Sequence, residues 1–545
     1  MTTKVRVQRL SGQIVDLHRR VVFPGTVEWR NGRITAIRSD ERVKEKRLIM
    51  PGLVDAHIHI ESSLLPPSEF ARLAVIHGTV ATVSDPHEIA NVLGEAGVRY
   101  MLADAKRSPL KFNFGAPSCV PATTFETAGA RLDSAAVARL LARKDVRYLA
   151  EVMNFPGVLG GDPELMAMIE AARHEGKQID GHAPGLRGEQ AKAYAKAGPT
   201  TDHECFTIKE ARDKLAAGMK ILIREGSAAR NFDALAPLLK SHPQSCMFCC
   251  DDLHPDLLTQ RHLDEHVRRA LATGADKFDV LRAASVNPVE HYGLTVGLLR
   301  EGEAADFIVV DGWKRFRVER TYIGGECVAS DGRTRLKRLA PKIANKFKAK
   351  PVKAADFVVE VAGETVNVIQ ALNGQLVTKH LTLPASQIGV RHDVLKIAVV
   401  NRYAPKAPVA VGFIRGFGLK AGALASSVAH DSHNIVAVGV DDVSLAAAVN
   451  LVIAERGGLS VVGPRVKAVL PLPIAGLMSA VEGRSAAKLY TKLDRTVKRL
   501  GSKLDAPFMT LSFMALLVIP DLKLSDRGLF SAAKWSFVPV SPELV

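Results

Sequence analysis

Short apolar runs alternate with longer stretches of helical periodicity between residues 49 and about 295. The apolar runs predict strands, and the stretches between them, such as 163–173 and 257–272, predict helices. The expected strands are 48–54, 79–84, 112–115, 147–152, 178–181, 199–202, 219–223 and 246–250. Strands and helices alternating in this number over about 250 residues are typical of a (β/α)8 barrel. We therefore expect one at 49–295.

Strand patterns without intervening helices flank the barrel on both sides. Before it, apolar alternation predicts strands at 5–7, 12–15, 26–29 and 33–37, the last two separated by the hairpin signal Asn31-Gly32. After it, strand character returns within 297–328. Because residues 1–48 are too few to fold alone, we expect them to join residues 296–332 in one small β-sandwich domain beside the barrel.

The remaining chain has a mixed pattern. Residues 333–355 are rich in lysine and arginine, which indicates a solvated linker or a solvated helix face. Residues 356–545 predict a separate C-terminal α/β domain with a helix at 442–456. Its expected strands are 357–361, 394–400, 408–413, 434–440 and 459–463.

Composition narrows the class of protein. The chain has 545 residues and a net charge of +16, which raises nucleic acid as a partner. Aromatic residues make up only 6%, and no basic run is interleaved with them, so we expect no nucleic acid. The longest apolar run, 514–519, is too short to span a bilayer, and no apolar signal core opens the chain. We expect a cytoplasmic protein without a membrane partner.

The six cysteines form no disulfide framework, which favours a reducing compartment. Cys246 and Cys249 have the spacing of half a zinc site, but no second pair accompanies them. We interpret them as part of a buried strand.

Metal-ligating residues follow the expected strands. His57 and His59 are separated by one residue at the end of the first strand, so their imidazoles share one face and can bind one cation. In a barrel of this kind, functional groups gather at the carboxyl ends of the strands. Further ligand types follow later strands: Asp85, His87, Glu88, Glu151, His182, His203, Asp251 and Asp252. So many ionisable groups are costly to bury at a barrel mouth without a cation. We therefore expect a metal-dependent barrel.

These residues can hold two metal ions, provided that an anionic ligand bridges them. We assign His57, His59 and Asp251 to one ion, and His182 and His203 to the other. Glu151 is the expected bridging ligand. A metal pair lowers the pKa of bound water, so a bridging hydroxide would be available to attack an electron-poor carbon. Asp251 can accept the hydroxide's proton and pass it to a leaving nitrogen; its neighbour Asp252 is the alternative, and the sequence does not separate them.

Two polar clusters have open roles. Asp85, His87 and Glu88 follow the second strand and can contact a substrate ring, although Glu88 can instead cap the following helix and Asp85 can satisfy nearby backbone. In the C-terminal domain, the cluster from His430 to Asn434 precedes a buried strand. It either serves structure or reaches the barrel mouth.

Long motifs resemble the bacterial adenine deaminases of the amidohydrolase superfamily over nearly the whole chain. The matching segments are 51–63, 85–94, 116–122, 180–186, 202–204, 224–227, 429–434 and 470–478. They include Pro-Gly-Leu-Val-Asp-Ala-His-Ile-His at the first strand and Ala-His-Asp-Ser-His-Asn in the second domain. Two departures, Cys249-Cys250 and the short Gly457-Gly458, leave the pocket shape open.

The resemblance implies hydrolytic deamination of adenine to hypoxanthine and ammonia in purine salvage, by a metal-bridged hydroxide attacking C6. It implies two Mn²⁺ or Fe²⁺ ions, with Zn²⁺ also compatible. The catalytic residues would be Asp251, Glu151 and His203, and the purine would be held by Asp85, His87 and Glu88. We expect a free purine base as the small-molecule partner and a homo-oligomer, a dimer or larger.

Three alternatives stay open at this point. A related deaminase would act on another 6-substituted purine, such as N6-methyladenine. A cyclic amidase or a deacetylase would share the superfamily, although a cyclic amidase would favour lysine where Glu151 stands. A basic RNA-binding protein would need no intact ligand set and would bind RNA with a steep salt dependence.

Overall fold

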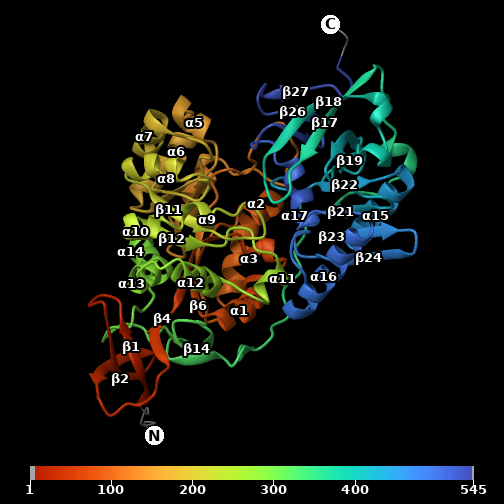
Figure 1. The fold of residues 1–545 in the computed structure, drawn as a ribbon. Coiled ribbons are helices and arrows are strands. Elements are labelled where there is room, and N and C mark those ends of the chain that lie inside the picture. Colours follow the sequence, from red (N-terminus) through yellow and green to blue (C-terminus); the bar gives the residue numbers. More distant parts are fainter. Residues whose placement is uncertain (1–6, 543–545) are drawn as a thin grey trace.

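The computed structural model describes residues 7–542 and has three parts, a barrel, a small β-sheet unit below it and a C-terminal unit beside it (Figure 1). The barrel contains a five-stranded and a three-stranded parallel sheet. Its strands are β5 (Leu53–Ile58), β6 (Thr79–Ser84), β7 (Lys111–Ala116), β8 (Val146–Val152), β9 (Gln178–Gly181), β10 (Thr201–Asp202), β11 (Lys220–Arg224) and β12 (Cys246–Cys249).

Backbone contacts join the two sheets into a closed barrel. On one side, the amide of Thr200 donates to the carbonyl of Ile179 at 2.8 Å. On the other, Ile58 and Asp251 form a parallel bridge, and the Asp251 amide donates to the carbonyl of His57 at 2.9 Å. The predicted (β/α)8 barrel is therefore confirmed. Cys246 and Cys249 both lie in a fully buried strand, as interpreted from the sequence.

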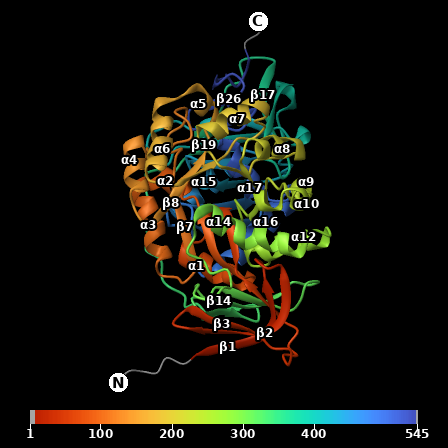
Figure 2. The same cartoon turned by 90° about the vertical axis from the view of Figure 1, so that its left-hand side faces the viewer.

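Helices cover the outside of the barrel (Figure 2). They form where the sequence supplies caps and one apolar face; α6, for example, starts at Pro163 and is capped by the Asp162 side chain. The helices of this unit are α1 (Pro67–Ala74), α2 (His87–Leu93), α3 (Glu95–Ala105), α4 (Ser134–Leu141), α5 (Phe155–Gly160), α6 (Pro163–His174), α7 (Gly188–Ala197), α8 (Ile208–Ala216), α9 (Phe232–Leu235), α10 (Leu238–Ser241), α11 (Pro255–Leu258), α12 (Leu263–Ala272), α13 (Lys277–Leu281) and α14 (Asn287–Tyr292).

The expected strand 48–54 is two strands. β4 (Leu48–Pro51) pairs with the small β-sheet unit, and β5 begins the barrel after Gly52. A Cβ atom at Gly52 would lie 2.3 Å from a methyl group of Val80 on β6, so only glycine fits where the chain crosses between the two units. The continuous apolar run concealed this break because both strands are completely buried.

The small unit is one eight-stranded sheet in the order β16-β15-β14-β13-β4-β1-β2-β3. Trp29 on β2 contacts Tyr322 on β14, with ring centroids 5.6 Å apart, although three strands separate β2 from β14. Strands lie about 4.8 Å apart in a sheet, so this contact requires the two halves to fold face to face as a sandwich. The strands are β1 (Gln8–Asp16), β2 (Val21–Arg30), β3 (Arg33–Ser39), β4, β13 (Phe307–Val310), β14 (Val318–Ile323), β15 (Glu326–Ser330) and β16 (Arg333–Thr334).

The hairpin at Asn31-Gly32 is present, and both residues have the positive φ angles that its turn requires. The strand expected at 5–7 falls largely on residues that lie outside the described ones.

The C-terminal unit contains a second eight-stranded sheet in the order β18-β17-β20-β19-β22-β21-β23-β24. Its strands are β17 (Thr365–Ala371), β18 (Thr378–Pro384), β19 (Leu395–Val400), β20 (Ala410–Arg415), β21 (Ala423–Ser426), β22 (Ile435–Gly439), β23 (Gly458–Gly463) and β24 (Val466–Pro471). The helices are α15 (Asp442–Ala454), α16 (Gly483–Arg499) and α17 (Pro507–Ser512), and a small sheet contains β25 (Leu522–Ser525), β26 (Gly528–Ser531) and β27 (Ser536–Phe537).

The strand expected at 357–361 is wrong. A 3₁₀ turn, Ala354–Phe357, ends there, and the residues after it pair with no strand. Val359 and Val361 pack against an apolar cluster of the sheet, whereas Val358 is exposed. A β-branched run alone does not make a strand, because strand formation also needs a free neighbouring edge. Residues 335–353 are an extended connection that contacts the barrel; the Tyr100 hydroxyl donates to the carbonyl of Lys342 at 2.9 Å. The domain boundaries given above stay predictions.

None of the helices in the described part of the chain combines the length and hydrophobicity that crossing a bilayer requires.

The Gly52→Ala substitution should reduce the free energy of unfolding by about 1–3 kcal/mol, because the added methyl group overlaps Val80 in a packed interior. Chemical denaturation measures the change. Gly160→Ala is the matched control, since a Cβ atom there meets nothing within 4 Å. Equal stability of the two variants would contradict this account of the break between β4 and β5.

Candidate metal centre and active site

Imidazoles and carboxylates from separate strands meet at the carboxyl end of the barrel. His57 is the penultimate residue of β5, and His59 follows that strand. Their Nε2 atoms lie 3.3 Å apart. The Oδ1 atom of Asp251, which follows β12, lies 3.5 Å from Nε2 of His57 and 3.1 Å from Nε2 of His59. The first predicted group of ligands is therefore close together.

Glu151 on β8 lies between this group and the next one. Its Oε1 atom is 3.3 Å from Nε2 of His59. Its Oε2 atom is 2.7 Å from Nδ1 of His182, after β9, and 3.2 Å from Nε2 of His203, after β10. All four of these side chains are buried. Glu151 thus contacts histidines of both predicted ligand groups.

The two adjacent aspartates, Asp251 and Asp252, have different hydrogen-bond partners. The Oδ2 atom of Asp251 accepts a hydrogen bond from Nη1 of the fully buried Arg224 at 2.6 Å. Burial alone raises the pKa of Asp251, but the Arg224 charge and the histidines hold it well below the usual range. Asp252 instead accepts a hydrogen bond from the Ser62 hydroxyl, and burial raises its pKa. Geometry places Asp251 among the imidazoles.

The donor set fits divalent metal ions. Nδ1 of His59 lies 3.2 Å from the carbonyl oxygen of Asp85, and donating there leaves the Nε2 lone pair facing the cluster. Burial lowers the pKa of His59, yet Asp251 and Glu151 raise it well above its usual value, so positive charge is strongly favoured at Nε2. Imidazole and carboxylate ligands within 4.8 Å of one another suit first-row divalent ions.

Strand β6 contributes a second polar group. The Asp85 carboxylate lies 3.0 Å from Nδ1 of His87 and also accepts from the His87 amide, so it orients that imidazole. His87 Nδ1 lies 3.4 Å from Oε1 of Glu151. His87 and Glu88 line the cavity beside the cluster, whereas Asp85 does not. Of the three residues expected to hold substrate, Asp85 is therefore placed behind the other two.

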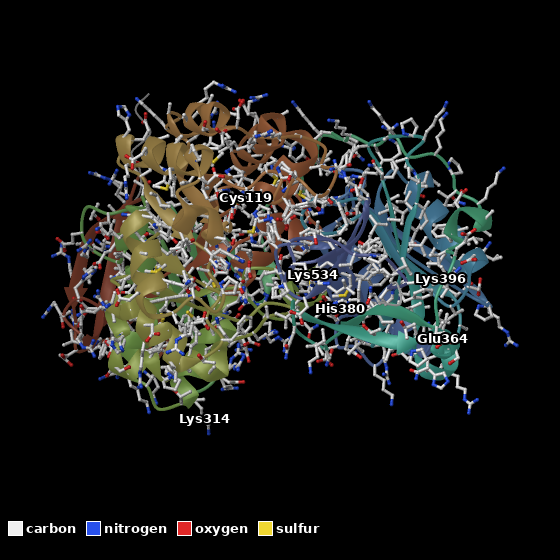
Figure 3. All side chains as sticks on the ribbon, turned by 90° about the horizontal axis from the view of Figure 1, so that it is seen from above. Cys119, Lys314, Glu364, His380, Lys396 and Lys534 are labelled. Carbon is white, nitrogen blue, oxygen red and sulfur yellow. The ribbon has the colours of Figure 1, made fainter. Side chains whose placement is uncertain are left out.

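The C-terminal unit completes the cavity. It lies beside the barrel (Figure 3). In that view Cys119 marks the barrel, and His380 and Lys396 mark the C-terminal unit. Nδ1 of His430 and Nε2 of His433 contact the two carboxylate oxygens of Glu88. The cluster at 430–434 therefore reaches the barrel mouth, one of the two alternatives left open by the sequence.

Several residues around the cavity were not expected from the sequence. Glu204 contacts Arg224 and lies 3.6 Å from Nε2 of His203. Leu376, Phe513 and Leu516 line the cavity from the C-terminal unit. Glu204 directly follows the predicted ligand His203 in the sequence, and this position could have indicated that Glu204 belongs to the site. The others approach from distant segments, and no local pattern indicates them.

A buried lysine connects the loops that carry His182 and His203. Lys214 on α8 is fully buried and donates to the carbonyl of Ala183 at 2.6 Å. It also donates to Asp202 and to Glu210, each at 3.0 Å. Ala183 and Asp202 adjoin His182 and His203 respectively, so one ammonium group connects the two loops that present these imidazoles.

A closed barrel with this cluster at its mouth defines a metal-dependent hydrolase of the amidohydrolase class. The model of the "Amidohydrolase family" matches residues 48–328, and that of the "Adenine deaminase C-terminal domain" matches residues 375–536. The chain belongs to the adenine deaminase family.

Curated relatives extend over nearly the whole chain. An adenine deaminase of Salinibacter ruber is 56% identical over 536 residues, covering 97% of this chain and 98% of the relative. One from a Sulfurovum species is 55% identical over 532 residues, with 97% and 99% covered. One from Methanosarcina barkeri is 50% identical over 548 residues, with 98% and 99% covered. The similarity therefore includes both the barrel and the C-terminal unit.

Lys214→Met should reduce the free energy of unfolding by about 3–5 kcal/mol, because it leaves the buried carboxylates of Asp202 and Glu210 without their cation. Thermal melting measures the loss. Lys192→Met removes an exposed lysine from an ion pair with Glu189 and should leave the melting temperature unchanged. Similar melting temperatures for both variants would show that Lys214 does not stabilise these loops.

Proposed function

We propose that the chain hydrolyses adenine to hypoxanthine and ammonia. The observation that supports this most is the Glu151 carboxylate, shared by histidines from three strands inside a cavity that the C-terminal unit closes. Relatives at 50–56% identity over both units carry the name adenine deaminase. The reaction would serve purine salvage.

Family membership implies a divalent metal. We assign two ions, Mn²⁺ or Fe²⁺ with Zn²⁺ also compatible. His57, His59 and Asp251 would hold one, His182 and His203 the other, and Glu151 would contact both. When bound, the ions would lower the pKa of water and make hydroxide available near neutral pH.

Asp251 is the proposed proton carrier. Its Oδ2 atom is held by Arg224, which keeps the carboxylate ionised and fixed in direction. It would accept a proton from the attacking water and return one to the leaving 6-amino nitrogen as ammonia departs. Glu151 and His203 would act at the same centre, where Nε2 of His203 lies 3.2 Å from the Glu151 carboxylate.

Glu88 and His87 would hold the purine by hydrogen bonds to its ring nitrogens, with Asp85 orienting His87. His430 and His433 contact both oxygens of Glu88 and so fix its carboxylate. Leu376, Phe513 and Leu516 would supply apolar surface to the faces of the ring. A cytoplasmic location and a homo-oligomer remain part of the proposal.

Purified protein supplied with Mn²⁺ or Fe²⁺ should release ammonia from adenine and form hypoxanthine, and should release little methylamine from N6-methyladenine. Chromatography of the purines together with an ammonia assay measures both reactions. Methylamine release with the higher kcat/KM would make the protein a deaminase of the substituted purine instead.

Asp251→Asn should lower kcat by about 10²–10⁴-fold, because proton transfer by a positioned carboxylate contributes an acceleration of that order. Asp252→Asn is the matched control and should lose far less, since Asp252 is directed to Ser62.

Glu151→Gln should reduce both turnover and bound metal, measured by elemental analysis. Full activity in Asp251→Asn, or full metal content and turnover in Glu151→Gln, would refute these roles.

A further inference from the structure

A second cavity adjoins the inner one that contains the proposed metal centre. The inner cavity has a volume of about 30 Å³, whereas the outer cavity has about 440 Å³. A volume near 30 Å³ is the share of one water molecule in the liquid, so a purine base enters the inner cavity only if its wall moves. The outer cavity lies within the usual range for small-molecule sites.

Among residues 7–542, Leu376 alone lines both cavities. It lies in the loop between β17 and β18, and its side chain is 7% exposed. The opposite wall of the outer cavity is the loop after β11, including Ser227, Ala228 and Ala229. The Leu376 side chain therefore forms a wall that the outer cavity shares with the cavity of the proposed reacting centre.

The loop after β11 is tied to the site. The carbonyl of Ala229 accepts from Nε of Arg224 at 2.6 Å, and its amide donates to the carbonyl of Gly374 at 3.1 Å. Arg224 in turn holds Asp251. One wall of the outer cavity is thus fixed to the catalytic centre, and through Gly374 it also holds the loop that carries Leu376.

A buried amine also holds that loop, at Leu376 itself. Nζ of Lys523 donates to the carbonyl of Leu376 at 2.6 Å and to the carbonyl of Phe513 at 2.9 Å. Both residues line the inner cavity. Burial lowers the pKa of Lys523 to about 7. Lys523 therefore fixes the backbone of the shared wall and leaves the Leu376 side chain as its movable part.

The outer cavity offers groups that suit a flat heteroaromatic ring. Phe206 lines it and is 40% exposed, which is unusual for a large apolar side chain and provides a stacking face. The amide of Gln375 and the hydroxyl of Thr510 line the same cavity and can bond to ring nitrogens.

We propose that the outer cavity is the site where a free purine base docks before it reaches the inner cavity, and that Leu376 limits which purines pass. This inference rests on the proposed function. A purine with a substituent on N9, such as a nucleoside, is wider than the free base, so the Leu376 wall would admit it more slowly than adenine.

The test uses the metal-loaded enzyme and measures steady-state kinetics together with association and dissociation rates of adenine by stopped flow. Leu376→Phe should lower both rates by a larger factor than it changes Kd, because the wider side chain obstructs entry and exit alike. Leu376→Ala should raise both rates and increase the ratio of kcat/KM for 9-methyladenine to that for adenine by about 10–200-fold, the usual range for small changes in an apolar wall. A residue that serves only packing would change Kd or melting temperature instead.

Leu372→Ala is the matched control, since Leu372 is a leucine of the same loop that lines neither cavity. Phe206→Ala should raise KM and leave kcat unchanged. Equal rates and equal substrate ratios in the Leu376 and Leu372 variants would overturn the proposal, and so would a wild-type enzyme that binds no purine. Rapid binding of adenine without ammonia release would instead refute the proposed function while leaving the docking site supported.

Discussion

The buried carboxylate of Glu151 is the constraint on which the site depends. Its two oxygens contact imidazoles that arrive from β5, β9 and β10, so these strand ends must meet within a few ångströms. Such convergence needs a closed barrel, and the bridge between Ile58 and Asp251 provides the closure. A shift of one residue in the register of a strand would turn its histidine to the other face. The proposed metal ligands therefore come together only if the barrel closes with its strands in the correct register.

The C-terminal unit belongs to the same centre. Burial raises the pKa of Glu88, while His430 and His433 hold it well below its usual value. Without these partners, Glu88 would be an unpaired carboxylate in an apolar surrounding, which is costly. The contact therefore stabilises the interface between the two units and also fixes a side chain that lines the proposed active-site cavity. Because residues of both units line this cavity, the proposed catalysis depends on the C-terminal unit as well as on the barrel.

The sequence predicted those features that depend on local periodicity. Alternation along strands and the position of strand ends were enough to predict the barrel and to bring five proposed ligands and the Asp251-Asp252 pair to one end of it. Helix α16 was not predicted, although Tyr490, Leu493 and Val497 recur on one face and are buried. The choice between Asp251 and Asp252 was not accessible, because it depends on Arg224 and Ser62, which approach from other segments. The position of Leu376 likewise depends on tertiary contacts of its loop, including those with Lys523 and Ala229.

Charge balance at the barrel mouth explains why the imidazoles face one another. Glu151, Glu204 and Asp251 are three buried carboxylates beside one guanidinium, that of Arg224. Neutral histidines do not offset the excess negative charge. Protons on the histidines would offset it, but they would occupy the same lone pairs that bind a metal ion. Protons and divalent ions therefore compete for the same nitrogen atoms, and metal affinity must fall as the pH decreases.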